Sequence, residues 1–436
     1  MKSECREGIE RFDSPGKGRG IRVTKEFKVG ELLFACPAYS YVLSVSERGY
    51  LCDHCFTKKD GLAKCAKCKK AFYCNAGCQK ADWAMHKLEC SSMCAYGENW
   101  CPSETVRLVA RILAKMRSQK EPQRGPSEKM LLMAELESHV DQMDSERKEM
   151  HEMDISALHH FYSKHLDFPD HSKLLSIFSQ VTCNGFTVED EELSHLGSAV
   201  YPDVALINHS CSPSVIVAYK GALAEIRAVQ NMKPGDEILT SYIDLLYPTE
   251  DRNARLRDAY YFTCTCAVCT CPKKDELKLK LRKRTEAPPP EEVARMNRYA
   301  RNSIREFRQA KHQKEPSELL QMCESSLDHM GALFDDANVY MLHMMYQAMG
   351  VCIYQGDWEE AARYGEKIIK PFSALYPAYS MNVASMYIKL GRLYVGLEKP
   401  TQGISLFKKA AAIMEITMGK DHASIESLKK EMLQKQ

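Results

Sequence analysis

The chain has 436 residues, a formal net charge of +2, and 44% hydrophobic and 27% charged residues. This composition is typical of a folded protein of two to four units, and so small a charge argues neither for nor against an acidic or nucleic-acid partner. We expect neither a signal peptide nor a membrane span, because no apolar run is long enough to cross a bilayer. The nineteen cysteines are therefore expected as thiols and metal ligands in a reducing compartment, the cytoplasm or the nucleus.

A glycine-rich turn at residues 14–20 opens the first predicted β region. Its sequence, Ser-Pro-Gly-Lys-Gly-Arg-Gly, spaces three glycines two apart, so the backbone can approach a ligand closely. An ordinary tight β-turn is the alternative interpretation. The apolar runs 32–36 and 41–43 that follow predict strands.

The segment 52–90 holds eight metal-ligand side chains in short spacings, which suit two tetrahedral zinc sites. A segment this short cannot bury a core, so metal binding would supply its folding free energy. Sequence alone leaves the pairing of the ligands open. They are Cys52, Cys55, Cys65, Cys68, Cys74, Cys78, His86 and Cys90.

The same segment is rich in lysine. Clustered lysines dominate non-specific affinity for nucleic acids, so a phosphate-binding face is one interpretation. A solvated surface over a metal-filled interior is the interpretation we favour.

Residues 102–180 have a helical pattern. Apolar residues recur at helical spacing after Ser103, a good N-cap. A polar, proline-bearing break at 119–126 precedes a second predicted helix, which starts at Ser127 and contains His139. A third helix is predicted from Asp154.

The stretch 201–271 combines an Asn-His pair, a tyrosine after an apolar strand, and four thiols. An isolated Asn208-His209 pair would most simply be a core histidine beside a turn. Here it is followed by a predicted hairpin with strands 215–219 and 223–229, and then by Tyr242. Four cysteines predict a third zinc site, with Cys271 as a spare thiol. They are Cys211, Cys264, Cys266 and Cys269.

These motifs resemble known families. Asn-His-Ser-Cys, Gly-Asp-Glu-x4-Tyr and Cys-x-Cys-x2-Cys are similar to the core and zinc tail of SET-domain lysine methyltransferases. Segment 52–90, with its closing His-x3-Cys, resembles the MYND zinc finger. The chain is identified as a member of the SET and MYND domain-containing protein-lysine N-methyltransferases. The runs at 98–100, 183–186 and 241–248 look most like the second member of that family.

The resemblance implies an α+β multidomain protein, with a β-rich SET domain split by the finger, a post-SET zinc site and a C-terminal α-helical domain like tetratricopeptide repeats. It also implies interleaved ligands, with Cys52, Cys55, Cys74 and Cys78 on one zinc ion and the other four on the second. The implied units are an N-terminal SET segment at 1–50, the finger at 51–90, a helical insert at 91–180, the core SET at 181–247, a post-SET segment at 248–271 and C-terminal helices at 272–436.

The activity that the resemblance implies is transfer of a methyl group from S-adenosylmethionine to lysines of histone and non-histone proteins, in chromatin and transcription regulation. A lysine with pKa about 10.4 costs about 4 to 5 kcal/mol to deprotonate at neutral pH. An aromatic channel beside a positive charge lowers that pKa, and its ring faces can hold a cation. The implied catalytic residue is Tyr242, and the implied channel residues are Phe186, Tyr260 and Phe262. The implied cofactor-binding residues are Lys17, Gly18, Arg19, His139, Asn184, Asn208, His209, Tyr260, Tyr261 and Phe262.

The region from Val293 onward is predicted to be helical, with a weak repeat of about forty residues that is similar to tetratricopeptide repeats. Stacked helix pairs form a concave surface suited to peptides, whereas a plain helical lid is the alternative. The resemblance implies that these helices narrow the substrate cleft and engage chaperone tails, and that the finger binds proline-containing peptides. The basic run 278–284 is either a nuclear address or, as we favour, a solvated connector.

One position departs from the family pattern. The family usually ends Asn-His-Ser-Cys-x-Pro with Asn, and this chain has Ser214 there. Serine is shorter and has fewer hydrogen-bonding groups, which predicts a looser loop and weaker activity. A non-enzymatic scaffold that recruits chromatin or chaperone partners is therefore the main alternative to an enzyme, and a DNA-binding adaptor is the second.

Overall fold

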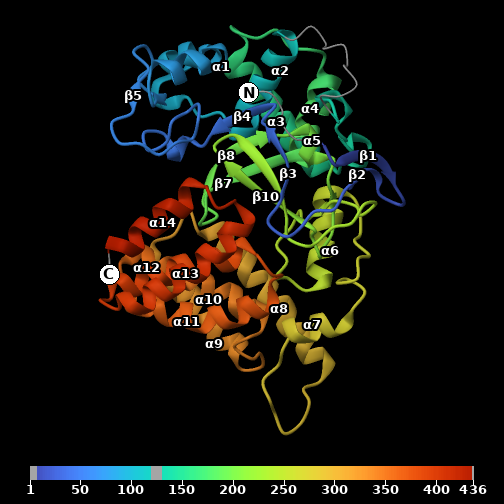
Figure 1. Ribbon diagram of the computed structural model, residues 1–436, viewed down its shortest axis with the longest axis vertical. Coiled ribbons are helices and arrows are strands. Elements are labelled where there is room, and N and C mark those ends of the chain that lie inside the picture. Colours follow the sequence, from blue (N-terminus) through green and yellow to red (C-terminus); the bar gives the residue numbers. More distant parts are fainter. Residues whose placement is uncertain (1–6, 119–129, 435–436) are drawn as a thin grey trace.

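The computed structural model describes residues 7–118 and 130–434, and it has two halves (Figure 1). The β strands, the finger and the first helices form the upper half in this view, and a stack of helices with the C-terminus forms the lower half. No helix within the described ranges combines the length and apolar character needed to cross a bilayer.

Short strands make up five small sheets, and the strands predicted at 32–36, 41–43, 215–219 and 223–229 are all present. Three sheets have the orders β1-β2, β10-β11-β3 and β4-β8-β7, and two further pairs are β5-β6 and β12-β9. The bounds are β1 Ile9–Ser14, β2 Gly18–Val23, β3 Leu32–Pro37, β4 Ser40–Leu43, β5 Ala63–Lys64, β6 Phe72–Tyr73, β7 Gly185–Glu189, β8 His195–Val200, β9 Asn208–His209, β10 Val215–Lys220, β11 Leu223–Ala228 and β12 Leu239–Thr240.

The β9–β12 pair is parallel, unlike the other four sheets. Leu239 lies opposite Asn208 and Thr240 lies opposite His209. This register places the chain after β12, where Tyr242 follows, directly beside the Asn-His pair. Two residues of pairing thus join motifs that are about thirty positions apart in the sequence.

Five helices surround the sheets: α1 Ala76–Tyr96, α2 Glu104–Ser118, α3 Ser145–Tyr162, α4 His171–Asn184 and the single turn α5 Pro202–Ala205. The N-cap expected before α2 is confirmed, because Ser103 Oγ accepts a hydrogen bond from the Val106 N–H at 3.2 Å. The third predicted helix begins earlier than Asp154. The Asp144 carboxylate accepts from the Arg147 N–H at 2.8 Å and therefore starts α3 at Ser145.

The prediction of a helix through His139 is wrong. The described part of that segment has only 3₁₀ turns at Met133–Glu135 and Val140–Gln142, and His139 has a left-handed φ of 52°. Distant side chains form hydrogen bonds with backbone carbonyl groups that would otherwise accept bonds within a helix. Gln180 Nε2, for example, donates to the Leu136 carbonyl at 2.8 Å. The predicted break at 119–126 and the start at Ser127 lie outside the described residues.

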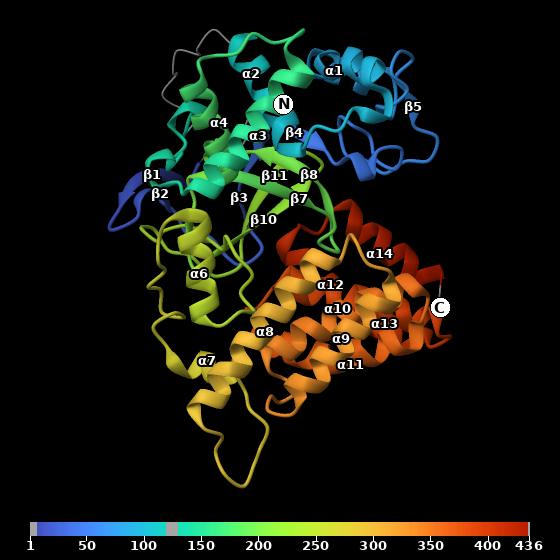
Figure 2. The ribbon, with the colours of Figure 1, turned by 180° about the vertical axis from the view of Figure 1, so that it is seen from behind.

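The predicted helical C-terminal region is confirmed. Seen from behind, α6 and α7 form a column beside this helical stack (Figure 2). The bounds are α6 Thr249–Tyr260, α7 Pro272–Lys278, α8 Pro290–Ala310, α9 Pro316–Gly331, α10 Val339–Gln355, α11 Trp358–Leu375, α12 Met381–Gly396, α13 Pro400–Thr417 and α14 Ala423–Gln434.

The weak repeat of about forty residues pairs Gly350 with Gly391, and these two glycines have different roles. A Cβ at Gly391 would lie 2.6 Å from the Phe407 ring, so α12 and α13 can approach only with glycine there. A Cβ at Gly350 would meet no atom within 4 Å. The two glycine positions of the repeat are therefore not equivalent, because only Gly391 lies at a close contact between helices.

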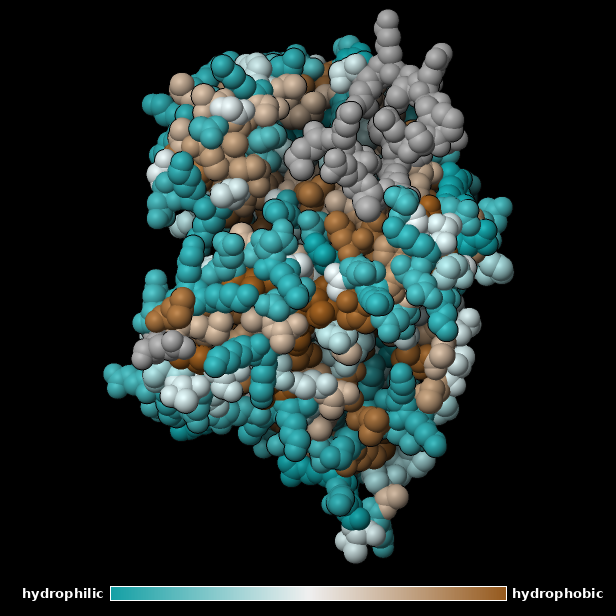
Figure 3. Space-filling model, in the orientation of Figure 1, coloured by the Kyte–Doolittle hydropathy of each residue, from teal (hydrophilic) through white to brown (hydrophobic). Residues whose placement is uncertain are grey.

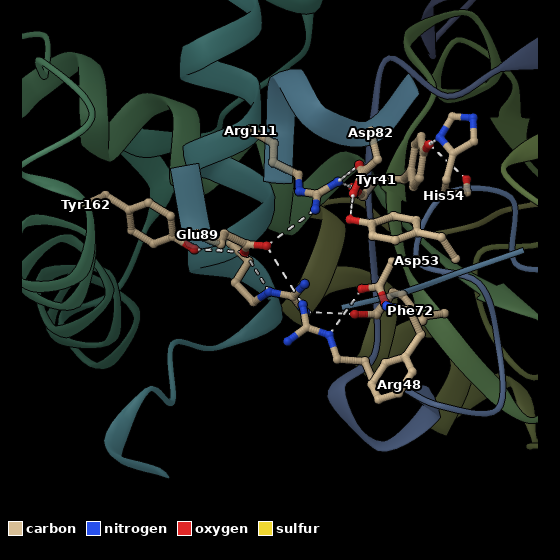
Figure 4. Close-up of polar contacts among 12 residues, drawn as sticks. Tyr41, Arg48, Asp53, His54, Phe72, Asp82, Glu89, Arg111 and Tyr162 are labelled. Carbon is tan, nitrogen blue, oxygen red and sulfur yellow. Dashed lines mark hydrogen bonds and ion pairs between the residues drawn. The ribbon is translucent and has the colours of Figure 1, made fainter. Parts of the chain in front are cut away.

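A buried network of charges joins the finger to the rest of the upper half (Figure 4). On α1, the Glu89 carboxylate accepts from Arg107 Nε at 2.8 Å and from Arg111 Nη2 at 3.3 Å. Arg111 Nη1 also donates to Asp82 at 3.1 Å, and Arg48 Nε donates to Asp53 at 3.1 Å. These charges balance, as buried ions require. Burial alone raises the pKa of Glu89, but the three arginines hold it well below its usual range.

The helical half contacts the upper half at several places, among them Asp244, Glu192 and Tyr219. Tyr376 Oη donates to Asp244 Oδ1 at 2.8 Å on one side, and His422 Nε2 lies 3.2 Å from the Tyr219 carbonyl oxygen on the other. Hydrophilic residues cover most of the face in Figure 3, and hydrophobic ones gather along its middle, where the halves meet.

Candidate active site

A cavity of about 1310 Å³ lies between the sheets, α6 and the helical half. Every residue predicted above for catalysis, the lysine channel or the cofactor lines it. These are Lys17, Gly18, Arg19, His139, Asn184, Phe186, Asn208, His209, Tyr242, Tyr260, Tyr261 and Phe262. The cavity is larger than a typical small-molecule site, so it has room for a cofactor and for a portion of a second molecule.

The glycine-rich turn joins β1 to β2 and forms one end of the cavity. Asn208 Nδ2 donates to the Arg19 carbonyl at 3.0 Å and to Glu237 Oε1 at 2.9 Å. Lys17 Nζ donates to the other oxygen of Glu237 at 2.8 Å. A Cβ at Gly20 would lie only 2.9 Å from Asn208 Nδ2, so glycine is needed for this close approach.

The His209 ring is buried and holds the backbone of Tyr242. Its Nδ1 accepts a hydrogen bond from the Tyr242 N–H at 3.0 Å, and its Nε2 lies 3.4 Å from Cys211 Sγ. Burial lowers the pKa of His209 to about 4, so the ring is neutral at physiological pH. Both ring nitrogens thus face protein atoms. The role of His209 in cofactor binding stays a prediction.

Tyr242 lies against three other rings. Its centroid is 5.3 Å from His209, 5.0 Å from Tyr260 and 6.3 Å from Phe262. The hydroxyl donates to the Ile207 carbonyl at 2.6 Å. Burial raises the pKa of Tyr242 well above its usual value, so the hydroxyl keeps its proton and its oxygen lone pairs remain able to accept.

The opposite wall is formed by His139 and Tyr261. Their ring centroids are 4.8 Å apart, and Arg147 Nη1 donates to Tyr261 Oη at 3.1 Å. Both residues have left-handed backbones, with φ of 52° and 61°. His139 therefore reaches the cavity from a turn and not from the helix that we predicted. Asn184, at the end of α4, donates through Nδ2 to the Glu137 carbonyl at 2.8 Å.

Sequence reasoning did not place residues 376–382 in the site, although they line the cavity from the helical half. Residues 376–380 connect α11 to α12 and residues 381–382 begin α12, and nothing in their local pattern indicates a site. It also missed Glu189, at the end of β7. Burial raises the pKa of the Glu189 carboxyl to about 7.

Three sets of ligand atoms match the predicted zinc sites, including the interleaved pairing in the finger. Zinc–sulfur bonds of about 2.3 Å at tetrahedral angles separate two sulfur atoms by about 3.8 Å. The Sγ atoms of Cys55 and Cys74 are 3.6 Å apart, those of Cys65 and Cys90 are 3.8 Å apart, and those of Cys211 and Cys269 are 3.6 Å apart. The sites therefore fit zinc, and Cys271 is not a member of the third set.

Comparisons with known proteins agree with this architecture. The MYND finger family matches residues 52–90. N-lysine methyltransferase SMYD2-A of Danio rerio is 64% identical over 433 residues, which is 99% of each chain. The chain belongs to the SET and MYND domain-containing protein-lysine N-methyltransferases.

Two more relatives of this methyltransferase cover nearly its full length. N-lysine methyltransferase SMYD2 of Homo sapiens is 63% identical over 432 residues, 99% of each chain. The protein of the same name from Gallus gallus is 64% identical over 425 residues, 98% of this chain and 97% of the relative. The family prediction, including the likeness to its second member, is thereby confirmed.

Proposed function

We propose that this protein transfers a methyl group from S-adenosylmethionine to lysine side chains of protein substrates. The observation that carries the proposal is the single cavity in which the glycine-rich turn, the Asn208–Glu237 contact and the ring cluster around Tyr242 meet. The near full-length identity to N-lysine methyltransferases supports the same reaction.

The cofactor supplies the methyl group and a positive charge. We assign its binding to the turn with Lys17, Gly18 and Arg19, to Asn184 and Asn208, and to the neighbouring rings of His139 and Tyr261. Amide and carbonyl groups there can bond polar atoms, and the ring faces can stack on an aromatic base or hold a cation. The cavity volume and this set of donors, acceptors and rings suit such a ligand.

The acceptor lysine must lose its proton before it attacks. Phe186, Tyr260 and Phe262 provide walls that desolvate the ammonium, which lowers its pKa and drives the proton toward water. With the cofactor bound, the neutral amine would be held with its nitrogen lone pair toward the methyl group, which the cofactor would supply. Because the Tyr242 hydroxyl donates to the Ile207 carbonyl, its oxygen lone pairs can accept from the amine and orient it.

We further propose histone and non-histone proteins as substrates, with roles in chromatin and transcription, and a location in cytoplasm and nucleus. The free thiols arranged as metal sites support a reducing compartment. Proline-containing peptides at the finger and chaperone tails at the helical half are proposed as partners on the family resemblance alone, and nucleic acid at the finger's lysines is the less favoured partner.

Substitution of the Tyr242 hydroxyl distinguishes an enzyme from a scaffold. Tyr242→Phe keeps the ring and should lower kcat and kcat/KM by about 10²- to 10³-fold with little change in KM, because the contact acts mainly in the transition state. Radiolabelled methyl transfer to a lysine peptide array measures this. Tyr247→Phe is the matched control and should be mild, since the Tyr247 hydroxyl does not line the cavity and accepts from the exposed side chain of Arg308. Equal activity of wild type and Tyr242→Phe would contradict the assignment.

A further inference from the structure

A fully buried arginine lies beside the third zinc-ligand set. Arg252, on α6, donates from Nε to Cys211 Sγ at 3.2 Å and from Nη2 to Cys269 Sγ at 3.3 Å. Its remaining hydrogen bonds go to the Tyr247 carbonyl at 2.6 Å from Nη1 and to Thr249 Oγ1 at 2.8 Å from Nη2. Arg252 therefore contacts two metal ligands and the backbone that follows Tyr242.

A second buried cation meets Arg252 on the same carbonyl. Lys278, at the end of α7, donates from Nζ to the Leu245 carbonyl at 2.6 Å and to the Tyr247 carbonyl at 2.9 Å. The sequence placed this lysine in a solvated connector, but only 5% of its surface is exposed. Two cations converging on one buried carbonyl repel each other, and such burial is costly unless a negative charge lies close by.

The third zinc site supplies that charge. A zinc ion with four thiolates has a formal charge of about −2, and Arg252 and Lys278 together contribute the opposite charge. The Asp275 carboxylate also lies near Lys278. Both of its oxygens accept from the Thr249 N–H at 3.1 Å, but it keeps its negative charge and so offsets part of the charge of Lys278.

The same contacts anchor the segment 242–247 at both ends. At its start, the His209 ring accepts from the Tyr242 N–H and lies against Cys211 Sγ. At its end, Arg252 and Lys278 bind the carbonyls of Leu245 and Tyr247. Both anchors lead back to the third zinc site.

We propose that Arg252 and Lys278 are the counter-charges of the third zinc site and that, through it, they position the segment carrying Tyr242. Neither touches the reacting atoms, so both are positioning residues. Loss of the metal would return protons to the thiolates and leave two buried cations without the negative charge of the site, which would loosen the segment. Only the effect on methyl transfer rests on the proposed function.

Zinc release from the full-length protein tests the charge pairing without reference to activity. We expect Arg252→Met to speed the transfer of one of its zinc equivalents to the chelator 4-(2-pyridylazo)resorcinol by about 10- to 100-fold, while the others leave at the wild-type rate. Arg252→Lys should be intermediate, because it keeps the charge but loses one N–H···S contact. Arg257→Met, at an exposed position on the same helix, is the matched control and should release zinc as wild type does. Equal release from Arg252→Met and Arg257→Met would overturn the proposal.

Cadmium substitution provides a second readout if Arg252→Met does not fold. In the full chain loaded with ¹¹³Cd, Lys278→Met and Arg252→Lys should each shift one Cys₄ resonance and leave the Cys₃His resonance in place. Unshifted spectra in both variants would overturn the proposal. In methyl transfer, Arg252→Met and Lys278→Met should both lose kcat with little change in KM, and Arg252→Lys should lose less kcat than Arg252→Met. An inactive wild type would contradict the proposed function but not the zinc result, whereas wild-type kcat in both variants would overturn the positioning role.

Discussion

Ser214 occupies the position where the family usually has asparagine, and the looser loop that we expected there is not found. Its Oγ accepts a hydrogen bond from the Leu239 N–H at 2.9 Å, and its own N–H donates to the Leu239 carbonyl at 2.8 Å. The short serine side chain reaches the Leu239 backbone because this loop and β12 lie close together. Ser214 therefore ties the Asn-His motif to the strand that leads to Tyr242.

We expect Ser214→Ala to lower the free energy of unfolding by about 1 to 2 kcal/mol, because the Leu239 N–H would lose its partner. Urea denaturation of the two proteins measures the difference. Ser214→Thr, which retains the hydroxyl, serves as the control and should lie nearer to wild type. Identical midpoints for Ser214→Ala and wild type would show that water replaces the hydroxyl.

Glu189 predicts a pH dependence. Because burial raises the pKa of its carboxyl to about 7, the folded state holds the proton that the unfolded chain releases at lower pH. Stability from this group is therefore greatest in acid and falls as pH rises toward 7. We expect Glu189→Gln to match wild type at pH 4 and to exceed it by about 1 kcal/mol at pH 8, where the charged form is penalised.

Thermal unfolding across this pH range measures the Glu189 effect. Glu286→Gln, at an exposed position, is the control and should follow wild type throughout. A stability difference of the same size at pH 4 and pH 8 would mean that the substitution acts through packing and not through charge.

At the scale of elements, α1 belongs to two structures at once. It supplies Cys78 to one ligand set of the finger, and His86 and Cys90 to the other. Its Asp82 and Glu89 side chains also accept hydrogen bonds from arginines of α2. The helix continues to Tyr96, past the predicted end of the finger at residue 90. The finger is thus attached by buried ion pairs and does not resemble a domain on a flexible linker.

Neutralising Glu89 measures how much the ion pairs between α1 and α2 contribute to stability. Glu89→Gln leaves Arg107 and Arg111 without their shared charge, and we expect the free energy of unfolding to fall by about 3 to 5 kcal/mol. Guanidinium denaturation followed by circular dichroism tests this. Glu98→Gln breaks the exposed pair with Lys70 and should change stability by less than about 1 kcal/mol. Equal effects of the two changes would contradict a role for the network.

At the scale of the whole molecule, the helical half completes the cavity. Residues 376–382 line it, and Tyr376 is held by its hydrogen bond to Asp244, two positions after Tyr242. On the far side, Glu192 forms an ion pair with Arg392 of α12. The halves are therefore joined at both Asp244 and Glu192.

Removal of the Tyr376 hydroxyl should loosen one of these contacts. We expect Tyr376→Phe to raise KM for a peptide substrate about 5-fold, the equivalent of one hydrogen bond of about 1 kcal/mol, with cofactor affinity nearly unchanged. Steady-state kinetics and calorimetry measure the two quantities. Tyr354→Phe, at a residue with 81% of its surface exposed, is the control. A change in cofactor affinity as large as that in KM would place Tyr376 in a different role.

The three ligand sets predict the metal content of the intact chain. Elemental analysis of purified protein should find three zinc ions per chain, two in the finger and one at the Cys211 set. Cys266→Ser should lower the content by one and disturb the wall formed by Tyr260 and Phe262, since Cys266 lies close behind both in the chain. A content of two zinc ions in the wild type would remove the third site.

The sequence by itself determined the metal-ligand residues and the main strands, because spacing within a motif reflects local backbone geometry and metal chemistry. The residues that meet at the cavity were implied by the resemblance to the SET and MYND family, which the motifs carry. The sequence predicted the backbone conformation less well where side chains distant in the sequence form hydrogen bonds with backbone carbonyl groups. His139 lies in a left-handed turn because Gln180 binds the carbonyl of Leu136 that a helix would use.

Only the tertiary structure decided the surroundings of isolated polar residues. Lys278 is in a run of basic residues that is typical of a solvated surface, yet it is buried because the carbonyls of Leu245 and Tyr247 and the third zinc-ligand set lie together there. Residues 376–382 belong to the active-site cavity because two halves of the chain pack against each other. Local pattern carries no record of such contacts, since they depend on which surfaces meet and not on the residues' neighbours in sequence.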